Sequence, residues 1–136
     1  MSLSVAALCL SLTMYEEARS EPKLAFNLVG EVVLTRAINK DVDVCEVILK
    51  RKQFTWVGDN GIKSVFGIMS HHNKVLRDIK PKDLKAMQLA EAKAYKMLSP
   101  EYQIKSKFNH FYSGSAPYWA KGKNTYKVGG LYFLKL

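Results

Sequence analysis

The apolar positions of the first forty residues recur at helical spacing and predict two helices. One side of the first carries Leu3, Ala6, Leu10, Thr13, Met14 and Glu17. Pro22 disfavours helical geometry at the residue before it, so this helix is expected to end near residues 19–21. A second helix is predicted over residues 23–39. Every fourth position in it is polar (Lys23, Asn27, Glu31, Thr35 and Asn39), which indicates either a solvated face or part of a cleft lining.

The pattern is less regular after residue 40. A short helix is predicted over residues 44–50, capped by Asp41 or Asp43. Residues 53–56 and 58–61 are typical of a loop, and residues up to about 80 give no clear period.

The last third predicts one long helix followed by a small sheet. The helix covers residues 82–98 and has an inner face made of Leu84, Met87, Ala90, Ala94 and Leu98, with lysines on its other faces. Residues 108–112 and 126–134 are short, aromatic and β-branched, which favours an antiparallel hairpin near the C-terminus. The expected fold class is therefore mostly helical α+β, with residues 1–136 forming a single domain.

Composition narrows the class of protein. A chain of 136 residues is long enough to bury a core without metal or disulfide cross-links. Its net charge of +9 favours polyanionic partners, which include nucleic acid, anionic glycan polymers and acidic membranes. The chain has no P-loop, GxGxxG or GxSxG motif, and this argues against nucleotide-dependent and α/β-hydrolase chemistry.

The apolar run over residues 3–14 has two interpretations. No basic residue precedes it and it continues into an acidic segment, so we expect a retained first helix rather than a signal peptide. No stretch is long enough to span a bilayer. Cys9 lies inside the run and is interpreted as a buried thiol. A pairing with Cys45 stays open, and their spacing fits no metal or redox motif.

Glu17 is the main candidate for chemistry because it continues the apolar stripe at the end of the first helix. Desolvation raises the pKa of a carboxyl group, and a Glu that stays protonated near neutral pH can act as a general acid. Cleavage of a glycosidic bond needs such a group. The alternative is a partly buried Glu neutralised by Arg19 or Arg36. Glu21 and Glu31 are candidate second carboxylates.

Other polar and aromatic residues give weaker signals. The adjacent histidines His71 and His72 are expected at the surface, because no HExxH or cysteine-rich pattern accompanies them. His110 is expected to make a structural hydrogen bond. Aromatic rings outside the helical stripes can stack on sugars or join the core; they are Phe54, Trp56, Tyr112, Tyr118 and Trp119. No metal or cofactor is expected.

Five segments in order resemble SleB-type cell wall hydrolases. Residues 17–22 (EARSEP) are similar to the family's EARGE-P signature, and residues 32–36 (VVLTR), 53–56 (QFTW), 109–120 (NHFY…PYWA) and 128–133 follow in register. Departures include Ser20 for Gly, Thr35 for Asn, and Tyr112 and Leu131 at positions where histidines are common. Glu31 stands at a position that is usually small.

The resemblance implies a lysozyme-like α+β domain in which Glu17 is the catalytic glutamate. The implied reaction is cleavage after N-acetylmuramic acid in peptidoglycan, by a muramidase or a lytic transglycosylase; an amidase is the alternative. The residues expected to bind substrate are Gln53, Phe54, Trp56, His110, Tyr118 and Trp119.

These features together predict a phage endolysin that acts as a monomer. It would be made in the host cytoplasm without a signal peptide and would act on the wall from the periplasm after release. Its partners would be peptidoglycan and anionic envelope polymers, with no nucleic acid expected. The rival from another class is a basic nucleic-acid-binding module, which would use the lysines of the 82–98 helix.

Overall fold

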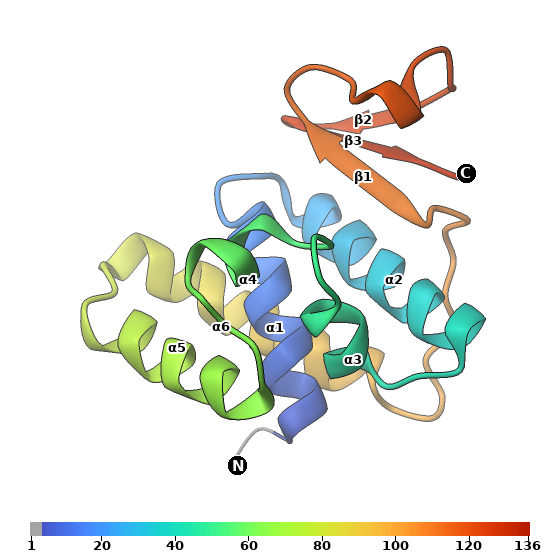
Figure 1. The fold of residues 1–136 in the computed structure, drawn as a ribbon. Helices are drawn as coiled ribbons and strands as arrows, with labels where there is room; N and C mark the ends of the chain where they lie inside the picture. The colour runs from blue at the N-terminus through green and yellow to red at the C-terminus, as the bar shows by residue number, and fades with distance from the viewer. Residues whose placement is uncertain (1–3) are drawn as a thin grey trace.

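The computed structural model describes residues 4–136 and shows six α-helices followed by a three-stranded antiparallel sheet (Figure 1). The helices are α1 (Val5–Ala18), α2 (Lys23–Lys40), α3 (Val44–Leu49), α4 (Thr55–Asp59), α5 (Val65–Arg77) and α6 (Pro81–Met97). The strands are β1 (His110–Ser113), β2 (Tyr126–Val128) and β3 (Leu131–Leu134), with a 3-10 turn at Tyr118–Ala120. The predicted α+β class is confirmed.

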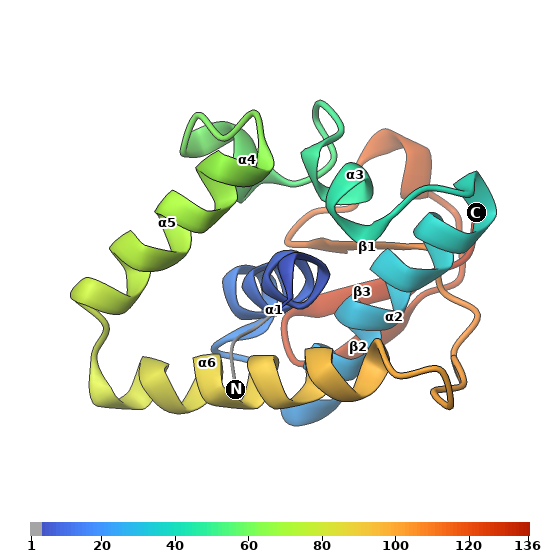
Figure 2. The same cartoon turned by 90° about the horizontal axis from the view of Figure 1, so that it is seen from below.

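Helix α1 is the centre of the helical body. It packs against α2, α3, α5 and α6, and Figure 2 shows it enclosed by them. Its buried side chains surround the helix on nearly every side, which explains why its sequence is apolar almost throughout. Ser4 caps its N-terminus, accepting a hydrogen bond from the amide of Ala7 at 3.1 Å. The helix ends at Ala18, close to the predicted end; Leu3 of the predicted stripe lies outside the described residues.

Three other helices match their predicted ranges within one or two residues. In α3, the carboxylate of Asp43 accepts from the amide of Glu46 at 3.0 Å, so Asp43 rather than Asp41 is the cap. In α6, Met87, Ala90 and Ala94 are buried as expected, but Leu84 of the predicted inner face is exposed. None of the helices within residues 4–136 is long and apolar enough to cross a membrane.

The segment between α3 and α6 differs from the prediction. Residues 53–61 were expected to form a loop, but residues 55–59 make the single helical turn α4. The unassigned stretch contains α5, in which only Ile68 is fully buried. Its apolar and polar residues nevertheless separate onto two sides of the helix, so the sequence of this segment does carry a helical period, which the prediction missed.

The C-terminal sheet has three strands where a hairpin was expected. Residues 126–134 form two strands joined by a turn at Gly129 and Gly130, and β3 lies between β1 and β2. Gly129 has a φ of 58°, a conformation that glycine adopts at low cost. The carboxylate of Glu21, in the α1–α2 turn, accepts a 2.6 Å hydrogen bond from the amide of Gly130. Glu21 therefore attaches the sheet to the helical body.

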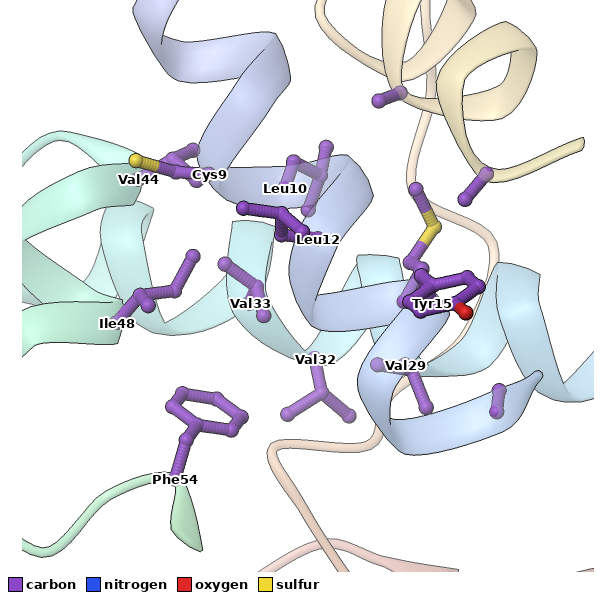
Figure 3. Close-up of a cluster of buried hydrophobic side chains, with 14 of the residues drawn as sticks. Cys9, Leu10, Leu12, Tyr15, Val29, Val32, Val33, Val44, Ile48 and Phe54 are labelled. Carbon is purple, nitrogen blue, oxygen red and sulfur yellow. The ribbon is translucent and has the colours of Figure 1, made fainter. Parts of the chain in front are cut away.

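Cys9 and Cys45 form a disulfide that links α1 to α3, with their Cα atoms 5.5 Å apart. Cys9 is buried as predicted, but it is not a free thiol, because it is bonded to Cys45; the pairing that the sequence left open is formed. Figure 3 shows the Cys9 sulfur beside Val44 in the core.

Glu31 is buried in α2 and fixes the connection between α6 and β1. Its carboxylate accepts from the Tyr102 hydroxyl at 2.5 Å, the Ser106 amide at 2.9 Å and the Lys105 amide at 3.3 Å. Glu31 and Asn27 also line a cavity of about 640 Å³, so part of the predicted polar stripe does face a cavity.

Candidate active site

Glu17 lies in the last turn of α1 beside a cavity of about 260 Å³. Four parts of the chain meet there: the end of α1, the C-terminal part of α2, the residues around the start of α4, and strand β1. The residues that line the cavity are Glu17, Arg36, Gln53, Phe54, Thr55, Phe111, Tyr112 and Ser113. Figure 1 shows why these segments meet, because β1 runs above α2 and the α3–α4 connection approaches from the side.

Burial raises the pKa of Glu17 from its ordinary value of 4.5 to about 7, and the negative charge of the neighbouring Glu16 adds to the increase. The two arginines considered as neutralising partners make other contacts. Arg19 is exposed and donates to the Tyr15 hydroxyl at 3.1 Å. Among residues 4–136, no ion pair to Glu17 is formed. Glu17 is therefore a half-buried carboxyl group that is protonated below about pH 7, far above the range of an exposed glutamate.

Arg36 joins three walls of the cavity. Its Nε donates to the backbone carbonyl of Asn109 at 2.8 Å, and its Nη1 donates to Oε1 of Gln53 at 3.1 Å. Its guanidinium also lies over the Phe54 ring, 5.7 Å from the centroid. Burial lowers the pKa of Arg36. Because the side-chain carbonyl of Gln53 already accepts a hydrogen bond from Arg36, its Nε2 amide group remains to donate a hydrogen bond to a ligand.

Trp56 was predicted to bind substrate, but the structure buries it away from the cavity. Its ring stacks on His71 with centroids 5.5 Å apart, and His71 Nε2 lies 3.9 Å from Glu16 Oε1. His71 and His72 are consequently half-buried, so the prediction of two surface histidines is wrong.

The predicted residues of the C-terminal third (His110, Tyr118 and Trp119) are not among those that line the cavity. The His110 ring packs on Trp119 at 5.3 Å, and its Nδ1 lies 2.9 Å from Oδ1 of Asn109, in agreement with a structural role. Trp119 meets the Tyr112 ring edge-on at 6.2 Å. Tyr118 is 86% exposed.

Of the six residues predicted to bind substrate, Gln53 and Phe54 line the cavity. Sequence reasoning missed Thr55, Phe111 and Ser113 as lining residues, and it gave Arg36 only as a neutralising partner. The sequence did point to Arg36, because it is the last residue of the VVLTR segment that resembles the family. Phe111 had the same kind of signal, because it lies in the NHFY segment of that resemblance.

The fold and the cavity together define a small α+β domain that presents a carboxyl group with a pKa raised to about 7 among polar and aromatic side chains. Such a group supports general-acid chemistry. A model of the Cell Wall Hydrolase family matches residues 20–134, and the chain belongs to this family, the SleB type that its motifs resemble. Membership supports a general role as a peptidoglycan hydrolase. The match begins just after Glu17.

No curated protein and no solved structure shows significant similarity to the chain. Within residues 4–136, no three His, Cys, Asp or Glu side chains are grouped as a metal-binding cluster.

Proposed function

We propose that the protein cleaves the glycan strand of peptidoglycan at N-acetylmuramic acid, with Glu17 as general acid and then general base. The observation that carries this proposal is the burial of Glu17 beside a cavity, which raises the pKa of its carboxyl group to about 7. The leaving glycosidic oxygen must receive a proton as its bond to C1 breaks, and a carboxyl group with a pKa near 7 can supply that proton.

The number of carboxylates in the cavity favours one outcome of the cleavage. Glycosidases with two carboxylates place them roughly 5–10 Å apart on either side of the bond. Glu17 is the only carboxylate among the residues that line this cavity, because Glu21 binds the β2–β3 turn and Glu31 binds Tyr102. A single carboxylate is sufficient for a lytic transglycosylase, in which the sugar supplies its own nucleophile.

In the proposed steps, Glu17 loses one proton and then regains one. Its carboxyl group gives a proton to the leaving oxygen, and the C1–O bond breaks. The resulting carboxylate then takes the proton of the muramic acid 6-hydroxyl as that oxygen attacks C1. The product is a 1,6-anhydro sugar, and Glu17 is protonated again for the next cycle.

The remaining lining residues would bind and orient the sugar. The amide of Gln53 and the hydroxyls of Thr55, Tyr112 and Ser113 offer hydrogen bonds, and the Phe54 ring offers a stacking surface. Tyr118 and Trp119 would contact glycan units further along the strand. Trp56 and His110 would act indirectly, by supporting α4 and Trp119.

We further propose that the protein is a phage endolysin that works as a monomer. The Cys9–Cys45 disulfide supports action outside the reducing cytoplasm, because disulfides persist in oxidising compartments. The net charge of +9 would favour adsorption to anionic envelope polymers.

Mass spectrometry of digested peptidoglycan tests the proposed reaction. We expect 1,6-anhydro-muramic ends, because the lone carboxylate leaves the 6-hydroxyl as the nucleophile. Reducing muramic ends would assign a muramidase and would require a water-activating group. Free stem peptides with intact glycan strands would assign an amidase and would contradict the role given to Glu17.

A further inference from the structure

The outer face of α5 exposes three large apolar side chains. Phe66 is 79% exposed, Met69 45% and Leu76 38%. Their spacing of three and seven residues places them on one side of the helix. Single exposed apolar residues are ordinary, but a stripe of them on one helix indicates an interaction surface.

The position of α5 itself is fixed by its inner face. Ile68 is fully buried, and His71 stacks on Trp56. Ser64 caps the helix by accepting from the Gly67 amide at 3.2 Å. Figures 1 and 2 show α5 at the margin of the helical body, far from the sheet and with one side turned outward. The exposed stripe therefore belongs to an ordered helix.

Cationic side chains lie along one side of the stripe and beyond both ends of the helix. Lys74 and Arg77 lie on α5 itself, while Lys63 and Lys80 lie just before and after it, and all four are exposed. Asp78 is the one carboxylate between Lys63 and Lys80 in the sequence. Within residues 4–136, none of the four cations forms an ion pair. An apolar stripe bordered by unpaired cations is the pattern of a helix that lies in a membrane interface.

We propose that the outer face of α5 binds the surface of an anionic lipid bilayer. Phe66, Met69 and Leu76 would enter the boundary between headgroups and acyl chains, while the flanking lysines and Arg77 would contact lipid phosphates. The 13 residues of α5 extend about 20 Å, so the helix would lie along the surface. A second copy of the chain is a poorer occupant, because it would bring the same cations face to face.

This inference goes beyond the proposed function and does not depend on it. Lipid binding would hold a wall hydrolase at the membrane surface, where newly made glycan strands emerge. The cavity beside Glu17 is lined by residues from α1, α2, β1 and the start of α4, and none from α5. Membrane binding and glycan cleavage can therefore be separated by substitution.

Co-sedimentation with vesicles tests the proposal. We expect the native protein to bind vesicles that contain phosphatidylglycerol and to bind phosphatidylcholine vesicles much more weakly. The double variant F66S/M69S should lose about tenfold or more in partitioning. The matched control I38S removes an apolar side chain that is 68% exposed on α2, and it should bind as the native protein does. Both variants should digest lipid-free peptidoglycan at the native rate.

Two results would overturn the proposal: no binding to phosphatidylglycerol vesicles, or equal binding by the native protein and F66S/M69S. A dimer that F66S/M69S dissociates would assign the face to a second copy instead. If circular dichroism shows that F66S/M69S is unfolded, the charge-reversal variant K74E/R77E replaces it in the co-sedimentation experiment. We expect K74E/R77E to reduce vesicle binding in the same way. E17Q should keep full vesicle binding, which distinguishes failure of this inference from failure of the proposed catalysis.

Discussion

The variant Glu17→Gln is expected to lose about 10²- to 10⁴-fold in the rate of wall lysis, the range that a general acid contributes. Gln has nearly the same shape and cannot deliver a proton to the leaving oxygen, so the cavity should remain while the chemistry stops. The measurement is the fall in turbidity of purified wall suspensions at pH 6. A variant that clears walls at the native rate would remove Glu17 from the mechanism.

The adjacent carboxylate offers a matched control. Glu16 is half-buried, lies 3.9 Å from His71 and does not line the cavity. Glu16→Gln should retain lysis at pH 6. It should also lower the pKa of Glu17, because the like charge of Glu16 contributes to the increase. Its activity should therefore decline at a lower pH than that of the native enzyme.

The stability of Glu17→Gln distinguishes lost chemistry from lost folding. The pKa of Glu17 is about 7 in the folded protein against an ordinary value of 4.5, so the folded state binds the proton more tightly. The free energy of unfolding therefore falls as pH rises from about 4.5 to about 7, by up to about 3 kcal/mol. Gln does not ionise, so Glu17→Gln does not lose stability in this way as pH rises. The variant should match the native protein near pH 4 and exceed it at pH 8 in thermal unfolding.

Removing the disulfide with the double variant C9A/C45A should lower the free energy of unfolding by about 4 kcal/mol. The two cysteines are 36 residues apart in the sequence, and closing a loop of that length restricts the unfolded chain by about this amount. Chemical denaturation without reductant measures the difference. A change below about 1 kcal/mol would mean that the pair does not cross-link the protein.

Reductant supplies the control for this prediction. Adding it should destabilise the native protein toward the level of C9A/C45A and leave the variant unchanged. Activity should also fall in the variant when it is warmed. Helix α3 has six residues, too few to be stable alone, and it leads directly to Gln53 and Phe54 in the cavity. The disulfide therefore secures one wall of the site.

Local sequence patterns were sufficient to predict those elements that bury one clear face or are enclosed on all sides. Helices α1, α2 and α6 have long apolar periods, and Pro22 marks the end of the first helix. Helix α5 was missed although its apolar and polar residues lie on different sides, so its helical period was present in the sequence. The third strand was missed because residues 126–134 were predicted as one strand. Gly129 and Gly130 form a turn that divides this segment into β2 and β3.

The candidate site could be predicted only in part. Glu17 follows from the apolar stripe of α1, since a carboxyl group on such a face must be desolvated. The family resemblance suggested Gln53 and Phe54, which line the cavity. The packing of β1 against α2 decides which aromatic residues join them. These two elements are far apart in the sequence, since the contact between Arg36 and Asn109 joins residues more than 70 positions apart. Trp56 was therefore expected beside the cavity, whereas it is buried against His71.

The protonation state of Glu17 is the physical basis of the whole mechanism, and it can be measured directly. Carbon-13 NMR of protein labelled at the glutamate carboxyl carbons gives a titration curve for each residue, and comparison with Glu17→Gln identifies the resonance of Glu17. We predict a midpoint near pH 7. A midpoint near 4.5 would show a carboxylate that is ionised at neutral pH, and it would contradict the role of Glu17 as the general acid.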